Sequence, residues 1–283
     1  MTYVGKYDLG IGTRKLLLNQ NYIIMKETEV FKLTENEKLL LENNDFYGFV
    51  RQRAERDEGI IFLLENLNLQ QWKTFLEKQY HAFSEEVQKK IVLSNDLEKF
   101  KVCLKNWCFK LCKEAQALLF TLPDVLLLKE YIKSGRELHS DLLYYILREP
   151  RYKDCIPMYV AKYKLPETWE MAFLQEAPFA LIKKYIHKYT DAFSGDTCQV
   201  WLLTTRRYRR LFMCFIDSGK CLNESIDTTL VESNDKSLFK YYVSRYALSD
   251  AALFALCKSE NPTLMKIYLH CQIDGMAPYT PSC

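Results

Sequence analysis

An apolar pattern with a period of about 27 residues runs through most of the chain. Its most regular feature is a pair of adjacent apolar residues, the first usually aromatic, which occurs nine times: Phe49-Val50, Phe75-Leu76, Cys103-Leu104, Tyr131-Ile132, Tyr159-Val160, Tyr185-Ile186, Phe215-Ile216, Tyr242-Val243 and Tyr268-Leu269. The first residues of successive pairs are 26 to 30 positions apart. Spacing this regular indicates tandem structural repeats.

Each repeat predicts two helices separated by a short turn. An aliphatic residue lies eleven or twelve positions before most of the pairs, as at Leu119 and Leu174. Between the two positions stands a turn marker, which is proline in four repeats and an Asn-Asn or Asn-Asp pair in three others. Because the apolar residues of Leu181–Ile186 fall at i, i+1, i+4 and i+5, they cover one stripe of a helix. We call the first helix of each repeat A and the second B.

Residues suited to helix ends stand where this division requires them. The predicted N-caps are Thr34, Ser84, Ser140, Ser194, Asn223 and Ser249. Thr34 and Glu37 have the spacing of a capping box, and Pro166 suits a first helical turn. Gly135 and Gly219 each follow a B-helix pair by four residues, which predicts a left-handed helix end.

The predicted fold class is therefore all-α, a right-handed α-α superhelix (solenoid) of about nine to ten helix-turn-helix repeats. We expect a single domain over residues 1–283, with a lead at 1–12, the repeat array at 13–273 and a tail at 274–283.

The passage Ala252–Leu269 resembles an ankyrin helix pair, in which an Ala/Leu-rich helix meets a Gly-Asn turn and a second aliphatic helix. The chain is thus similar to degenerate ankyrin- and HEAT-type repeats, although it lacks the Thr-Pro-Leu-His motif and its repeats are shorter. It also resembles short tandem helical repeats of bacterial proteins of unassigned function, on the joints Ser244–Asp250 and Tyr163–Pro166. The resemblance covers residues 33–273 and implies the fold, with no catalytic motif.

Composition narrows the class of protein further. Nine Gly and eight Pro in 283 residues, with 48% hydrophobic residues, indicate a packed chain with few loops. The formal net charge of +3 does not by itself favour a nucleic-acid binder, and no apolar run predicts a membrane span. Ten cysteines without a CxxC motif suggest small buried residues in a reducing compartment. We expect a cytoplasmic protein, with secretion as an effector by a specialised system as the alternative.

The sequence offers no recognisable reaction chemistry. It contains no phosphate-binding loop and no hydrolase elbow, and its four histidines do not have metal-ligand spacing. The acidic residues, such as Glu85-Glu86, fall at helix starts, where the helix dipole favours them. We therefore expect a protein that is not an enzyme, with no cofactor and no metal site.

The strongest local feature is a basic cluster, Arg206-Arg207-Tyr208-Arg209-Arg210, with Lys183 and Lys184 one repeat earlier. The expected function is a protein–protein interaction module or scaffold that binds a protein or peptide along the repeat surface. Tyr145, Tyr152 and Trp169 are either exposed aromatic anchors for the partner or core residues. The alternative is binding of nucleic acid or another polyanion through a basic face that includes Arg206–Arg210. What distinguishes the two alternatives is whether the Lys and Arg residues of successive B helices line one face, as a basic nucleic-acid-binding face requires, or scatter. The sequence leaves the oligomeric state open.

Overall fold

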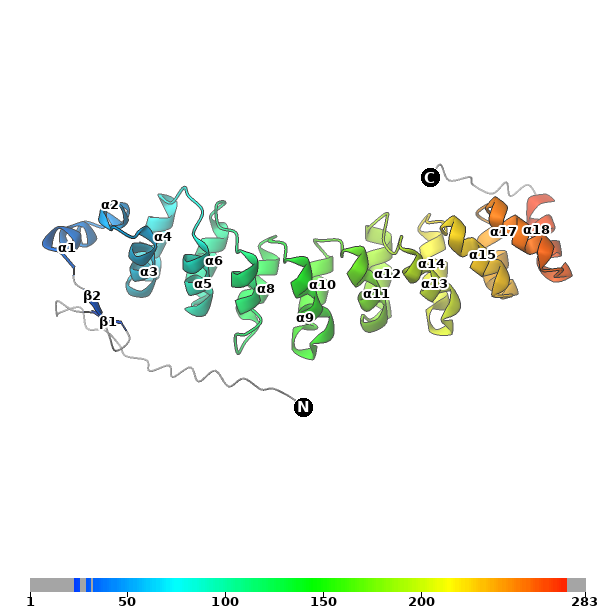
Figure 1. Cartoon of the computed structure of the whole chain (residues 1–283), viewed down its shortest axis with the longest axis horizontal. Coiled ribbons are helices and arrows are strands. Elements are labelled where there is room, and N and C mark those ends of the chain that lie inside the picture. The colour runs from blue at the N-terminus through cyan, green and yellow to red at the C-terminus, as the bar shows by residue number, and fades with distance from the viewer. Residues whose placement is uncertain (1–22, 26–28, 32, 274–283) are drawn as a thin grey trace. The chain divides into compact units, whose positions relative to one another are not determined.

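The computed structural model describes residues 23–25, 29–31 and 33–273, and Figure 1 shows that helices dominate them. Apart from the helices, the described residues contain one antiparallel pair of strands, β1 (Ile23–Met25) and β2 (Glu29–Phe31), with Ile24 opposite Val30. The prediction of an all-α chain is confirmed apart from this pair. The predicted lead at 1–12 and tail at 274–283 lie outside the described residues.

Contacts between Cα atoms divide the chain into two compact units, Met1–Val87 (unit 1) and Gln88–Cys283 (unit 2), and the boundary falls within helix α5 (Glu85–Leu93). The expected single domain stays a prediction. No helix of the described ranges is long and apolar enough to cross a membrane.

Unit 1 contains β1, β2 and two helix pairs. The helices are α1 (Glu35–Glu42), α2 (Phe46–Gln52), α3 (Arg56–Asn66) and α4 (Leu69–Glu77). Helix α2 packs against both α1 and α3, and the rings of Phe49 and Phe62 lie 5.3 Å apart between them. The predicted capping box is confirmed, because the backbone N–H of Glu37 donates to Thr34 Oγ1 at 3.2 Å and the N–H of Thr34 donates to Glu37 Oε2 at 2.7 Å.

Unit 2 continues the alternation of A and B helices. The odd-numbered helices are α7 (Lys113–Leu118), α9 (Leu143–Arg148), α11 (Glu167–Glu176), α13 (Asp196–Thr204), α15 (Glu224–Glu232) and α17 (Asp250–Lys258). The even-numbered helices are α6 (Leu97–Lys105), α8 (Leu126–Lys133), α10 (Cys155–Val160), α12 (Phe179–Lys188), α14 (Arg209–Asp217), α16 (Lys236–Val243) and α18 (Pro262–Ile273). Three short 3-10 helices join them: η2 (Ser140–Leu142), η3 (Pro150–Tyr152) and η4 (Arg206–Tyr208).

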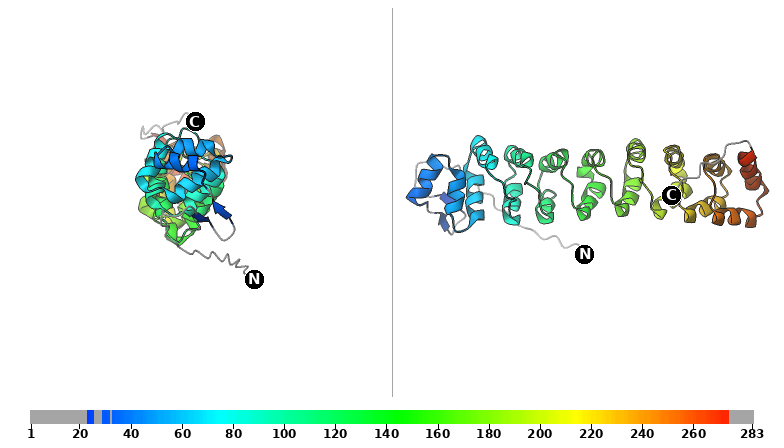
Figure 2. Two further views of the ribbon diagram at one scale, coloured as in Figure 1. Left: turned by 90° about the vertical axis from the view of Figure 1, so that its left-hand side faces the viewer. Right: turned by 90° about the horizontal axis from the view of Figure 1, so that it is seen from above.

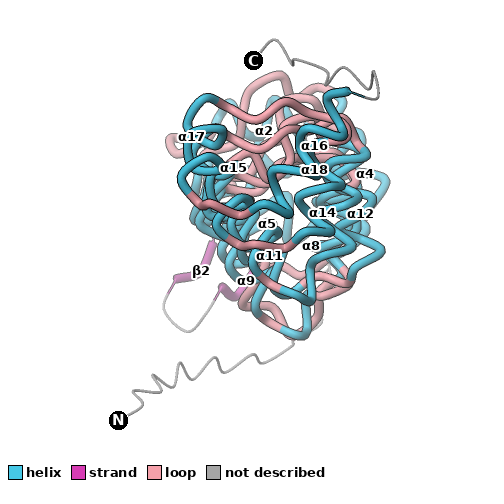
Figure 3. Tube along the Cα trace, turned by 90° about the vertical axis from the view of Figure 1, so that its right-hand side faces the viewer, coloured by secondary structure: helices cyan, strands magenta, loops and turns pink. Residues whose placement is uncertain are grey.

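The helices of unit 2 form two rows, because most of them pack on the helix two places further along the chain. Even helices pack as α6 on α8, α8 on α10, α12 on α14, α14 on α16 and α16 on α18. Odd helices pack in the same way from α9 to α17, and members of a pair such as α15 and α16 pack on each other. Figure 3 shows α9, α11, α15 and α17 on one side and α8, α12, α14, α16 and α18 on the other. Figure 2 shows these helix pairs following one another in chain order.

The apolar pairs that defined the repeat all lie on even helices. In eight of the nine pairs both residues are buried, and the Tyr185 and Tyr242 rings are among the largest buried side chains. The ninth pair differs, since Tyr268 is half-buried and Leu269 is 50% exposed. It lies on α18, which is the last helix of the described range and packs on α16 and α17. The predicted helix pairs are therefore present, and their packing is compatible with a helical repeat.

The turns confirm the predicted backbone shapes. Gly135 and Gly219 have φ values of 80° and 84°, the left-handed region that glycine enters without a steric penalty. Asn44, Asn95 and Asn234 adopt the same region, with φ from 50° to 57°. In all three turns the next residue is an aspartate whose carboxylate accepts N–H groups of the following helix, as the Asp235 carboxylate does from Ser237 and Leu238. Asparagine therefore makes the turn and aspartate caps the B helix.

Two predicted N-caps are wrong by one residue. Ser140 lies inside η2, and its predecessor His139 provides the cap through Nδ1, which accepts from the N–H of Asp141 at 3.4 Å. The predicted cap Ser194 lies one position before the true N-cap of α13, Gly195, which has no capping side chain. Ser249 is confirmed, because its Oγ accepts from the N–H of Ala252.

Candidate functional site

The predicted basic cluster divides into exposed and buried members. Tyr208 is only 4% exposed, with its ring 6.2 Å from that of Trp201, so it belongs to the core of unit 2. The guanidinium of Arg207 lies over the Tyr208 ring, and Arg209 Nη2 is 3.1 Å from Asp235 Oδ1. Arg206, Arg207 and Arg210 are exposed and have no ion pair within the described part of the chain. These three arginines are the members of the cluster with charge available to a partner.

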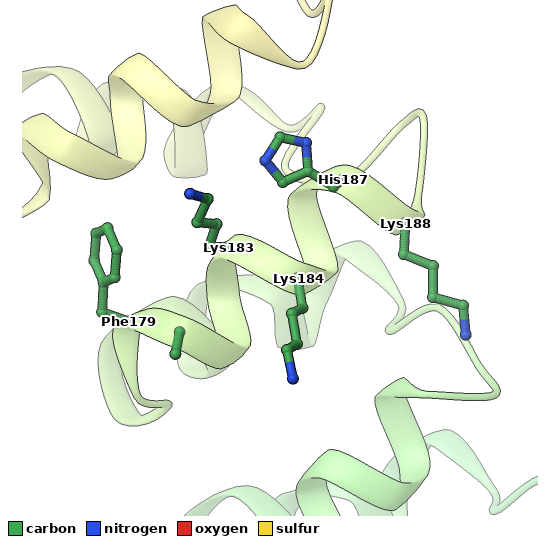
Figure 4. Close-up of a pocket in the computed structure, with 6 residues that line it drawn as sticks. Phe179, Lys183, Lys184, His187 and Lys188 are labelled. Carbon is green, nitrogen blue, oxygen red and sulfur yellow. The ribbon is translucent and has the colours of Figure 1, made fainter.

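Lys183 and Lys184 lie on α12, which packs against α14. With Phe179, Ala180, His187 and Lys188 they line a shallow hollow of about 580 Å³ on that helix. Figure 4 shows the labelled side chains projecting from α12, with the charged groups at the ends of their stems. Phe179 is 44% exposed. The hollow therefore combines an accessible aromatic ring and aliphatic lysine stems with several cationic groups.

The two helix rows of unit 2 carry opposite charge. Helices α6 to α18 of the even row hold thirteen basic residues: Lys99, Lys101, Lys105, Lys129, Lys133, Lys183, Lys184, Lys188, Arg209, Arg210, Lys236, Lys240 and Lys266. Their three acidic residues are Glu98, Glu130 and Asp217. Helices α7 to α17 of the odd row show the reverse, with three basic and nine acidic residues.

Helix dipoles explain part of this separation, because several odd-row acids lie in first turns. The dipole does not explain lysines in the middle of even helices. Five even helices of unit 2 carry a lysine two positions before the first residue of the apolar pair: Lys101, Lys129, Lys183, Lys240 and Lys266. Two residues correspond to about 200° of helical rotation, so this position points away from the core. We call these five residues the lysine column.

The members of the lysine column differ in how far their charge is neutralised. Lys101 pairs with Glu98 at 2.8 Å, and Lys129 lies 3.4 Å from Asp154. Lys183, Lys240 and Lys266 are exposed and have no ion pair among the described residues. Accessible positive charge in the column is therefore concentrated on α12, α16 and α18.

Other lysines of unit 2 support the structure. Lys188 Nζ donates to the carbonyl of Ala161 and Lys162 Nζ to that of Lys133, so each caps the end of the preceding even helix. Lys220 Nζ donates to the carbonyl of Ile186 at 2.6 Å, and burial lowers the pKa of its ammonium group. The hydroxyl of Tyr189 donates to the carbonyl of Val160 at 2.9 Å, which links α12 to α10. These groups hold successive even helices together and are less available to a partner.

A column of buried polar side chains on odd helices was missed by the sequence reasoning. Its members accept a backbone N–H from the start of the next odd helix or from the loop before it. The pairs are Gln88 Oε1 with Cys112 N (2.5 Å), Gln116 Oε1 with His139 N (2.7 Å), Glu170 Oε2 with Phe193 N (2.9 Å), Gln199 Oε1 with Asn223 N (2.8 Å) and Asp227 Oδ2 with Ser249 N (2.8 Å). Four of these acceptors stand four residues after an N-cap. That recurrence was the signal available in the sequence.

Glu170 is the most enclosed member of this column, at 0% exposure. Its Oε1 accepts from the hydroxyl of Tyr185 at 2.8 Å, and that hydroxyl accepts from the N–H of Leu165 at 3.0 Å. Burial raises the pKa of the Glu170 carboxyl, and burial together with the neighbouring carboxyl raises the pKa of Tyr185. Both carboxyl oxygens of Glu170 accept hydrogen bonds from other residues of the chain. The Glu170 carboxyl therefore links neighbouring repeats.

Three further sequence predictions concern single side chains. Tyr145 is 41% exposed and Trp169 half-buried, as an aromatic anchor requires, whereas Tyr152 is 1% exposed and its hydroxyl donates to the carbonyl of Phe120. Of the two alternatives for Tyr152, the structure therefore supports a core residue. Of the cysteines that the structure describes, four are buried (Cys103, Cys155, Cys198 and Cys271), and burial raises the pKa of Cys155 to about 11.

No protein-family model, curated protein or solved structure matches this chain. The resemblance to ankyrin- and HEAT-type repeats therefore stays a prediction.

Proposed function

We propose that this chain is an α-helical solenoid that acts without catalysis and binds an acidic partner protein along its even helices. The proposal of a solenoid is supported by the recurrence of one helix pair and by the packing of most helices of unit 2 on their second neighbour. Stacked helix pairs create an extended surface, which repeat proteins commonly use to hold other proteins or peptides.

The observation that carries the proposed function is the charge of the even row. Its thirteen basic and three acidic residues give unit 2 a basic face that the net charge of the whole chain, +3, conceals. A face of one sign attracts partners of the opposite sign and raises their association rate. The predicted residues Arg206, Arg210, Lys183 and Lys184 belong to this face or lie beside it.

Fluorescence anisotropy of labelled polyglutamate and labelled polyuridylate tests this function. We expect polyglutamate to bind and its affinity to fall steeply with salt, because the contacts are between exposed charges. Reversal of Arg206, Arg210, Lys183 and Lys184 to Glu should abolish this binding. Tighter binding of polyuridylate would favour the alternative of a nucleic-acid partner, and binding of neither probe would contradict the proposal.

A further inference from the structure

We propose that the lysine column binds an extended acidic segment of the partner in polyproline II conformation. Every third residue of this segment faces the even helices, and it is acidic wherever the facing helix carries a column lysine. This inference rests on the proposed function and names the kind of segment that the even row accepts. The relevant part of the column runs over α12, α14, α16 and α18, which pack in succession.

The spacing of the column matches this conformation. Packed helices lie about 8–10 Å apart, so one column position per even helix places cationic groups at about that interval. A polyproline II segment has three residues per turn and rises about 3.1 Å per residue, so every third side chain returns to the same side after about 9.3 Å. In a β-strand, every second side chain returns to the same side after about 6.8 Å. This spacing is shorter than that of the column, so the side chains of a strand and the lysines would be out of step within two helices.

The column is interrupted at one helix in a way that predicts the segment's sequence. On α14 the equivalent position is Met213, which is half-buried, and it stands between Lys183 on α12 and Lys240 on α16. The exposed ring of Phe179 lies on α12 as well. The segment that fits has an apolar residue opposite Met213 and acidic residues opposite Lys183, Lys240 and Lys266.

The surface favours a polypeptide over a single-stranded nucleic acid. Proteins that hold single strands stack successive bases on aromatic rings. Among the described even helices of unit 2, Phe179 is the one aromatic side chain among the exposed large hydrophobic residues. Tyr241 is half-buried, with its hydroxyl donating to Asp217 and the Arg245 guanidinium 3.9 Å over its ring. The row therefore offers regular charge without a series of stacking platforms.

The test uses two labelled peptides of the same composition, four repeats of Glu-Pro-Pro and a peptide in which the four Glu form one block. Binding to the full chain is measured by anisotropy at low salt, with polyglutamate and polyuridylate as further probes. We expect the repeating peptide to bind about fivefold more tightly than the block peptide. We also expect Lys240→Glu to weaken the repeating peptide about fivefold, since it replaces an attraction between exposed charges by a repulsion.

Lys258→Glu is the matched control, because Lys258 is an exposed lysine on the odd helix α17. This substitution changes the net charge by the same amount as Lys240→Glu. Equal affinity of the two peptides, or an equal loss of affinity for the repeating peptide in Lys240→Glu and Lys258→Glu, would overturn the role of the lysine column. If polyglutamate still bound, the proposed function would stand. Tighter binding of polyuridylate than of either peptide would overturn the choice of a polypeptide. Binding of no anionic probe would instead contradict the proposed function itself.

Discussion

Replacing Tyr185 by Phe tests whether the buried polar links between repeats stabilise unit 2. The substitution keeps the ring, which is 1% exposed and lies 5.0 Å from that of Phe173, and removes only the hydroxyl. Two hydrogen bonds are lost, one donated to Glu170 Oε1 and one accepted from the N–H of Leu165. Because a buried N–H and a buried carboxyl oxygen are left without these partners, we expect a loss of about 2–4 kcal/mol.

Amide hydrogen exchange provides the most local measurement. If opening of this link exposes the Leu165 amide, a loss of about 2–4 kcal/mol should accelerate its exchange about 30- to 700-fold, at 1.4 kcal/mol per factor of ten. Chemical denaturation followed by circular dichroism should show a lower midpoint for the same variant.

Tyr159→Phe is the matched control. Tyr159 occupies the same repeat position, is 2% exposed and makes no hydrogen bond through its hydroxyl within the described residues. Its substitution should change stability by less than about 0.5 kcal/mol. Equal effects of the two substitutions would refute the role assigned to the Tyr185 hydroxyl.

Three further changes probe the same architecture. Burial raises the pKa of Glu170, so its ionisation costs the folded chain stability as the pH rises from the ordinary glutamate value of 4.5 through the folded pKa. The stability of Glu170→Gln relative to the native chain should therefore increase as the pH rises from low to neutral, which denaturation across pH checks. Gln116→Glu, which introduces a buried carboxyl, should instead lose stability relative to the native chain over the same pH range. Gly219→Ala should lower the free energy of unfolding by about 1 kcal/mol, because the φ of 84° is unfavourable for alanine while no atom within 4 Å obstructs a Cβ. Gly219→Asn should lower it less, and thermal unfolding of both variants measures the difference. Deleting residues 140–166, which joins the cap His139 to the first residue of α11, should leave a folded chain with one helix pair fewer by circular dichroism and cooperative unfolding; collapse to an unfolded chain would contradict a repeat array.

The period of the apolar pairs was enough to place the helix pairs. A residue such as Phe215 or Tyr242 must lie on a helix whose apolar stripe is continuous, and nine recurrences define the phase of every turn between Thr34 and Tyr268. The turn residues carried similar weight, because a left-handed backbone suits Gly135 and Asn234 and few other residue types. Caps were less certain, since Ser194 and Gly195 are both acceptable N-caps and packing decided between them.

The candidate surface was only partly visible in the sequence. The run Arg206–Arg210 stood out because its charges are contiguous, yet Tyr208 is buried and Arg209 is paired. The lysine column did not stand out, because its members are 26 to 57 residues apart. Only the packing of even helices on one another brings lysines such as Lys240 and Lys266 onto neighbouring helices.

The sequence by itself determined the helices, their pairing and the backbone shape of the turns, because these depend on residues within one repeat. The tertiary structure decided which polar groups are buried and which charges share a face. Glu170 meets the N–H of Phe193, and Gln116 that of His139, only when consecutive odd helices are packed together. A glutamate or glutamine on an amphipathic helix is suited to water or to a buried hydrogen bond, and the neighbouring repeat supplies the donor that makes burial favourable.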